Sequence, residues 1–156
     1  MSEDHQHAYY QAGAVIHRKI VRITGDDWTT DVKDTWHDTQ NNAGTKLEYS
    51  FTPAVDGFVL ANAKASMSFS EANASSGVRL FEHISSVAID ETVNPSPLSG
   101  ALLSCSSTGI YEFTANTQVF IKAQVAFSTT NTAMTMTVRC TVEDYDGLFL
   151  IFFRAP

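Results

Sequence analysis

The sequence predicts an all-β fold, an antiparallel β-sandwich. Hydrophobic and polar residues alternate with a period of two over several stretches, of which the longest runs from Phe58 to Ser70. Short stretches of this kind are separated by turn-forming residues, and none shows the period of a long amphipathic helix. Many short strands at such spacing are typical of sandwiches and barrels. With 156 residues the chain has the length of one domain.

The N-terminal segment has no sustained hydrophobic period. Residues from Met1 to about Ala14 include acidic and histidine residues and two tyrosines, and such segments commonly dock onto a partner or lack order. We therefore expect an N-terminal arm over residues 1–15 and one β-sandwich domain over residues 16–156.

Ile16 to Ile23 is the first predicted strand, and it is rich in Ile and Val. It also carries Arg18 and Lys19, and charges on a strand predict a place at the edge of a sheet, where they block unwanted pairing. A basic binding stripe is the alternative interpretation.

The segment from Thr24 to Ala43 gives mixed signals. Trp28, Val32 and Trp36 fall at helical spacing, whereas the threonines between them favour strand or loop. We expect a long loop with a short strand near Trp36. The residues Asn41 to Gly44 then predict a turn.

A clear period begins at Lys46. Leu47 to Thr52 is a predicted strand, and Pro53 to Gly57 a turn in which Asp56 and Gly57 supply the left-handed position. The strand from Phe58 to Ser70 is half-buried. Its inward side chains are Val59, Ala61, Ala63, Ala65, Met67 and Phe69.

The middle of the chain is less regular. Val78 to Ile84 is a predicted strand with Val78, Leu80 and Ile84 on one face. Ser85 to Ser99 includes Asn94-Pro-Ser-Pro97, and we expect these prolines to interrupt any ladder because they lack an N–H donor. A short apolar segment follows, from Ala101 to Cys105.

The next segments predict a hairpin. Gly109 to Thr114 and Thr117 to Phe127 are its strands, joined at Ala115 and Asn116. Thr132 to Val142 alternates again. The inward sets are Val119, Ile121, Ala123, Val125 and Phe127 in the first region and Met134, Met136, Val138, Cys140 and Val142 in the second.

The chain contains two cysteines, Cys105 and Cys140. Each has apolar neighbours of its own strand parity, which indicates two small buried hydrophobic side chains. A single disulfide is the alternative, and two cysteines do not decide between them.

The closing strand, Gly147 to Phe153, is apolar on both faces. Leu148, Leu150 and Phe152 point one way, and Phe149, Ile151 and Phe153 point the other. An antiparallel sheet usually leaves one face in water. We therefore expect the second set to contact a neighbouring subunit.

The charge of the chain excludes some partners. A formal net charge of -7 argues against a surface that binds nucleic-acid phosphates. The sequence shows no run of 18 or more apolar residues and no hydrophobic segment behind its acidic start, so we expect neither a membrane span nor a signal peptide.

No pattern of residues in the sequence indicates a catalysed reaction. The chain has no nucleophile elbow, and neither cysteine has a nearby histidine to activate it, so we predict that the protein is not an enzyme and uses no cofactor. Three groups of acidic or histidine side chains could hold a metal, but each lacks a supporting ligand set and is expected to be solvated. These groups are His5 with His7, Asp34 with His37 and Asp38, and Glu143 with Asp144 and Asp146.

Three segments resemble trimeric jelly rolls of the tumour-necrosis-factor and complement type. Tyr49-Ser-Phe-Thr-Pro-Ala-Val-Asp-Gly-Phe-Val resembles the family segment in which a strand ends in Phe-Thr-x-Pro, turns at glycine and re-enters on an aromatic residue. Tyr111 to Ile121 is similar to its paired strands, and Asp144 to Ile151 to its closing strand. Where the family commonly has Gly-Asp before the second paired strand, this chain has Asn116 and Thr117. The resemblance covers Lys46 to Pro156.

The resemblance implies a jelly-roll topology and a homotrimer. Virus and phage particles reuse such jelly rolls as decorations, fibres and knobs, so it also implies a structural protein at the virion surface whose partner is a capsid or tail protein. The expected trimer interface is Leu148, Phe149, Leu150, Ile151, Phe152 and Phe153. The residues expected to dock on the particle are Tyr9, Tyr10, Arg18 and Lys19.

A receptor-binding or carbohydrate-binding tip is the alternative function. Aromatic side chains on loops and sheet surfaces can stack on sugar rings. Trp28, Trp36 and Phe81 are the candidate contacts to a host-surface glycan, although packing in the core is the commoner fate of such residues.

Overall fold

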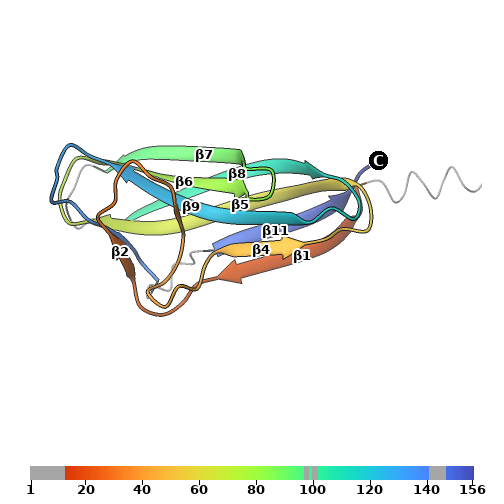
Figure 1. The fold of residues 1–156 in the computed structure, drawn as a ribbon, viewed down its shortest axis with the longest axis horizontal. Helices are drawn as coiled ribbons and strands as arrows, with labels where there is room; N and C mark the ends of the chain where they lie inside the picture. The colour runs from red at the N-terminus through yellow and green to blue at the C-terminus, as the bar shows by residue number, and fades with distance from the viewer. Residues whose placement is uncertain (1–12, 97–98, 100–101, 141–146) are drawn as a thin grey trace, which may run out of the picture.

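The structure, a computed structural model, describes residues 13–96, 99, 102–140 and 147–156. These residues form two antiparallel sheets that pack face to face in an elongated sandwich (Figure 1). The predicted all-β sandwich is confirmed. Within the described ranges no helix is long and apolar enough to cross a membrane.

Sheet A has six strands and is organised around β5. One edge of β5 pairs with β8, and the other pairs with β11 and then with β10. Strands β1 and β2 lie outside β11 and β10, so β1 occupies the edge position that its charges predict. The bounds are β1 Val15–Arg22, β2 Trp28–Thr30, β5 Gly57–Phe69, β8 Leu103–Phe113, β10 Met136–Val138 and β11 Gly147–Arg154.

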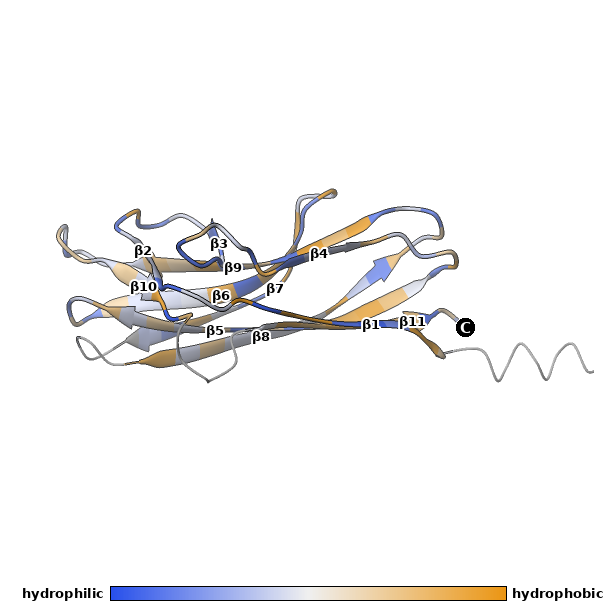
Figure 2. Ribbon diagram, turned by 90° about the horizontal axis from the view of Figure 1, so that it is seen from below, coloured by the Kyte–Doolittle hydropathy of each residue, from blue (hydrophilic) through white to orange (hydrophobic). Residues whose placement is uncertain are grey.

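Sheet B has five strands. Strand β6 pairs with β7 on one edge and with β9 on the other, and the short strands β3 and β4 lie along the far edge of β9. Figure 2 shows the two sheets as layers seen from the side. The bounds are β3 His37–Asp38, β4 Glu48–Phe51, β6 Ala74–Glu82, β7 Val87–Ser96 and β9 Val119–Ser128.

The core lies between the two sheets. It is filled by the inward side chains of strands in which inward and outward residues alternate. The inward residues predicted for β5 and β9 are all buried, and so are Leu148, Leu150 and Phe152 of β11. Met134, Met136 and Val138 are buried as predicted, whereas Val142 lies outside the described residues.

Cys105 and Cys140 are not joined by a disulfide, and both are buried. Cys105 lies on β8, where its sulfur accepts a contact of 3.4 Å from the side-chain amide of Asn94. Cys140 follows β10 and is 5% exposed. They therefore fill the core as small hydrophobic side chains, and the disulfide alternative does not hold.

The predicted hairpin around Ala115 and Asn116 is wrong, although the turn itself exists. Asn116 has a φ of 60°, the left-handed geometry that asparagine tolerates. The strands on either side belong to different sheets, because β8 pairs along its length with β5 while β9 pairs with β6. The turn is therefore a corner from sheet A to sheet B.

Pro95 does not interrupt the ladder as predicted, and Pro97 lies outside the described residues. Strand β7 includes Pro95, which is paired with Ser75 of β6. Strand β7 is an edge strand of sheet B and, among the described strands, pairs with β6 alone. The missing N–H of Pro95 therefore breaks no ladder with a second strand. Residues 103–105 and 109–113 of two separately predicted segments likewise belong to one continuous strand, β8, whereas Ala101 lies outside the described residues.

Strand β6 begins earlier and ends earlier than predicted. Ala74 to Gly77, which precede the predicted strand, already pair with β7, while Ile84 lies beyond the strand and is 52% exposed. Ile84 is therefore not an inward residue.

Gly57 does not take the predicted left-handed conformation. It is the first residue of β5, paired with both Phe113 and Arg154. A Cβ atom there would overlap the carbonyl oxygen of Phe153 and lie 2.8 Å from Cζ of Phe113. Close approach of two neighbouring strands, rather than turn geometry, requires the glycine.

The segment between β1 and β4 is mostly loop, as predicted, with β3 directly after Trp36 and an additional short strand, β2. Asn41 is buried at its centre. Its side chain donates to the carbonyl of Thr24 over 2.7 Å and accepts from the N–H of Thr45 over 2.8 Å. The predicted turn is confirmed by a hydrogen bond from the N–H of Gly44 to the carbonyl of Asn41.

Candidate functional site

Part of the outward face of sheet A is apolar, and its side chains come from four adjacent strands. Because Leu148, Leu150 and Phe152 point into the core, Phe149, Ile151 and Phe153 point outward, where they are half-buried. Outward side chains of β1, β5 and β8 extend this surface on both sides. We name the set the apolar patch: Val15, Ile20, Phe58, Leu60, Ile110, Phe149, Ile151 and Phe153.

The strand register places these side chains in rows. Ile151 is paired with Leu60 of β5, which is paired in turn with Ile110 of β8. Phe153 is paired with Phe58, and their rings stack with centroids 5.0 Å apart. The apolar side chains are therefore neighbours in one patch, which Arg18, Asn62 and Glu112 border on the same face.

Exposure of the patch is high at its margins. Ile110 is 62% exposed, Ile20 56% and Val15 41%. With strands about 4.8 Å apart and about 3.4 Å per residue, the patch measures roughly 15 Å by 17 Å. A standard protein interface buries about 800 Å² per partner, so the patch has the size of the apolar centre of one.

The predicted docking residues do not share one face. Arg18 and Lys19 are both exposed on β1, but consecutive residues of a strand point in opposite directions. Arg18 is paired with Ile151, beside the apolar patch, whereas the Lys19 ammonium lies over the ring of Tyr49 at 5.4 Å. Tyr9 and Tyr10 lie outside the described residues.

Of the predicted ligand contacts, Trp36 and Phe81 come together. Both lie on the outward face of sheet B, and the guanidinium carbon of Arg79 lies 4.6 Å from the ring centre of Trp36 and 4.7 Å from that of Phe81. Partial burial lowers the pKa of Arg79, although the charge of Glu91 acts in the opposite direction. Trp28 is separate, since it belongs to sheet A and packs against the core.

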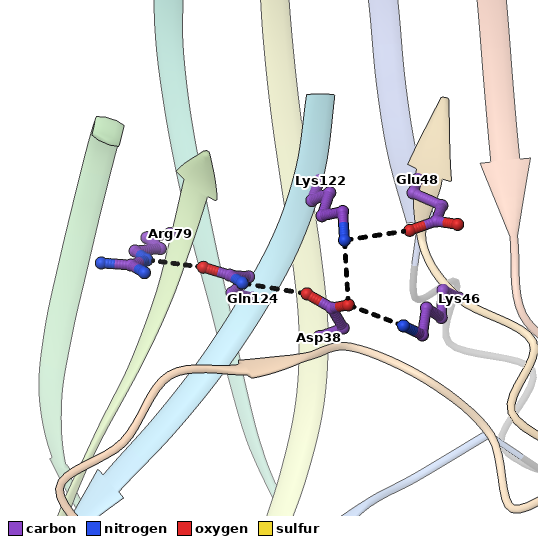
Figure 3. Close-up of polar contacts among 6 residues, drawn as sticks. All are labelled: Asp38, Lys46, Glu48, Arg79, Lys122 and Gln124. Carbon is purple, nitrogen blue, oxygen red and sulfur yellow. Dashed lines mark hydrogen bonds and ion pairs between the residues drawn. The ribbon is translucent and has the colours of Figure 1, made fainter. Parts of the chain in front are cut away.

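A network of polar side chains crosses the same face of sheet B (Figure 3). Asp38 accepts hydrogen bonds from Lys46 at 2.8 Å, Lys122 at 3.1 Å and Gln124 at 2.9 Å. Gln124 also accepts from Arg79 at 2.8 Å. The network ties the short strand β3 to β9 and β6, so its first role is to hold the loop that carries Trp36.

Asp38 should make the stability of the protein fall in acid. Partial burial would raise the pKa of Asp38, but hydrogen bonds from Lys46, Gln124 and Lys122 outweigh it and lower the pKa from 3.8 to about 2. Because the folded-state pKa is depressed, this stabilisation is present above pH 4 and is lost as the pH falls towards about 2. We expect a loss on the order of 1–2 kcal/mol.

Urea unfolding at several pH values between 5 and 2 measures this effect. Asp38→Asn should be less stable than the parent at pH 5, and the difference should shrink towards pH 2 because the parent loses its charge there. A constant difference over the whole pH range would contradict the role of the ionised carboxylate.

Asp34, His37 and Asp38 do not converge on a metal site. A His37 ring nitrogen lies 3.0 Å from the carbonyl of Val32, and Asp38 is engaged by two lysines. Within the described ranges no three His, Cys, Asp or Glu side chains form such a group. The other two groups considered, His5 with His7 and Glu143 with Asp144 and Asp146, lie outside those ranges.

Comparisons with known proteins find similarity in solved structures alone. No family model matches the sequence, and the comparison with curated proteins finds no match. A structure of infectious bursal disease virus, Gt strain, matches with a TM-score of 0.46 and 11% identity over 92% of this chain and 39% of the other. The Gx strain matches with a TM-score of 0.45, 7% identity and the same shares of both chains.

A hydrolase of the CocE/NonD family from Staphylococcus aureus has a TM-score of 0.41 and 9% identity over 86% of this chain and 34% of the other. In each of these three matches the chain spans less than two fifths of the length of the other protein. With TM-scores below 0.5, the matches do not assign the chain to a family.

Proposed function

We propose that this chain is a non-enzymatic structural subunit of a virus particle, of the phage decoration or fibre kind, and that it forms a homotrimer through the apolar patch. The observation that supports self-association is the apolar patch on the outward face of sheet A, whose side chains come from β1, β11, β5 and β8. Surfaces of this kind on soluble proteins mark interaction sites. The threefold symmetry of the assembly and its location on a virus particle are inferred from the jelly-roll resemblance.

Burial of the patch is the driving force of the proposed assembly. Full burial of an exposed Ile or Phe side chain contributes about 1.5–3 kcal/mol, and half-exposed side chains contribute correspondingly less. Eight such side chains in each subunit can offset an association cost of about 4–15 kcal/mol. Phe149, Ile151 and Phe153 lie at the centre of the patch and would meet at the trimer axis.

Attachment to the particle is proposed to use the N-terminal region. Residues 1–15, with Tyr9 and Tyr10, and the exposed Arg18 and Lys19 of β1 are the proposed contacts to a capsid or tail protein. Gly13 donates a hydrogen bond of 3.0 Å to the carbonyl of Arg154, so the N-terminal region joins the sandwich at the end that holds the C-terminus (Figure 1). The other end of the sandwich is then directed away from the particle.

Sedimentation of the purified full chain tests the assembly. We expect a mass three times that of the chain at micromolar concentration, and a well-folded monomer would overturn the proposal.

Immunogold labelling of gradient-purified particles from the source tests the location. Gold on the particle surface would support the structural role, and label only at the top of the gradient would contradict it.

A further inference from the structure

A groove opens on the outward face of sheet B beside Trp36. Its volume is about 290 Å³, and four segments distant in sequence form it. These are the loop before β3, the start of β6, Val93 of β7 and the end of β9. The groove-lining side chains used below are Asp34, Trp36, Ser75, Ala126 and Ser128.

The indole of Trp36 forms one wall of the groove. Arg79 packs over the ring at 4.6 Å and is not one of the residues that line the groove. A Cβ atom at Gly77 would lie 3.0 Å from Cη2 of Trp36, so the glycine lets the ring lie close to the backbone of β6. The ring is therefore held in place from two sides before any ligand arrives.

The polar groups around the ring point to hydroxyl groups as their partners. Asp34, Ser75 and Ser128 are exposed, and no hydrogen bond joins their side chains to any residue in the described ranges. The backbone N–H of Asp34 donates to the carbonyl of Phe127 over 2.9 Å, which fixes the loop against the end of β9. A carboxylate accepts and serine hydroxyls both donate and accept, which matches adjacent hydroxyls on a ring.

We propose that this groove binds one neutral hexose unit of a glycan. The C–H face of the sugar stacks on Trp36, two neighbouring hydroxyls donate to the Asp34 carboxylate, and Ser75 and Ser128 complete the contacts. A volume of about 290 Å³ lies at the small end of ligand pockets, which suits a single sugar ring. The negative charge of Asp34 selects against acidic sugars.

The location of the groove leaves it open after assembly. It lies on sheet B, whereas the apolar patch lies on sheet A, and it lies at the end of the sandwich opposite the chain ends (Figure 1). Sugar binding therefore does not depend on the trimer, and the two can fail separately.

Tryptophan fluorescence of a Trp28→Phe chain tests the site, because Trp36 is then the only indole. The probes are the methyl glycosides of glucose, galactose and mannose, with N-acetylneuraminic acid as the acidic comparison. A neutral ligand of this size is expected to bind with a dissociation constant on the order of 1 mM. At least one neutral glycoside should give a saturable shift, and the acidic sugar should give none.

Two substitutions locate the binding in the groove. Asp34→Asn should weaken binding at least tenfold without disturbing the loop, since asparagine tolerates the φ of 54° at this position. Ala126→Leu should block the groove while leaving every proposed contact residue in place. Phe81→Ala is the matched control, because this ring touches Arg79 outside the groove, and it should leave the affinity unchanged.

The proposal is overturned if none of the neutral glycosides shifts the fluorescence of Trp36. It is equally overturned if binding survives Ala126→Leu or if the acidic sugar binds and the neutral ones do not. A trimer that fails to bind sugars would remove this inference and leave the structural role intact.

Discussion

Replacing Ile151 with Glu is expected to convert the proposed trimer into a folded monomer. Ile151 lies at the centre of the apolar patch, between Arg18 of β1 and Leu60 of β5. Its side chain points away from the core, so a carboxylate there stays in water in the single chain. In the assembly the same carboxylate would be removed from water among apolar side chains, and an ion pair with the neighbouring Arg18 would offset only part of that desolvation cost.

Sedimentation velocity, paired with near-ultraviolet circular dichroism, separates loss of assembly from loss of fold. Ile151→Glu should sediment with the mass of one chain and keep the spectrum of the parent. Ser106→Glu is the matched control, because Ser106 is exposed on the same face outside the patch and is paired with Lys64. This control should stay trimeric. An Ile151→Glu variant that keeps three times the chain mass would show that the patch is not the interface.

Replacing Gly57 with Ala is expected to be the most destabilising single-methyl change in the sheet. The added Cβ would overlap the carbonyl oxygen of Phe153 and press on the ring of Phe113, which packs in the core. Backbone atoms of a paired strand cannot move aside without breaking the ladder between β5 and β11. We expect a loss of about 3–5 kcal/mol and a melting temperature lower by roughly 10 °C or more.

Thermal unfolding of Gly57→Ala and Gly44→Ala measures this steric cost. Gly44 has a φ of 81° and open space around its Cβ position, so alanine there costs only the backbone strain, about 1 kcal/mol. Equal melting temperatures for the two variants would mean that the close approach of Phe153 does not constrain β5.

The sequence predicted which residues form the core because inward positions follow from alternation within one strand. Every predicted inward position of β5 and β9 is buried. The local sequence does not show which distant strands pair with each other. For this reason the corner at Asn116 was predicted to be a hairpin. In the same way, Pro95 appeared to end a strand, because the sequence does not show that β7 has a free edge.

The candidate surfaces were predicted in part for the same reason. The outward set of the closing strand was read directly from its two-sided hydrophobicity, whereas Leu60 and Ile110 join it only through the register of three strands. Phe58 and Leu60 do carry a local signal, since they are apolar residues at the start of the polar side of β5. The groove beside Trp36 carries none, because Asp34 and Ser75 meet only in the fold.

The pairing of β1 with β11 at the chain ends determines how the molecule bears mechanical load. The N–H of Arg154 donates to the carbonyl of Ala14, so both ends leave the sandwich side by side. If the chain is anchored by its N-terminal region and the force is applied at the opposite end of the sandwich, the hydrogen bonds between β1 and β11 are loaded along the strand axis, in shear. Pulling the two termini apart would instead unzip β1 one pair at a time, at much lower force.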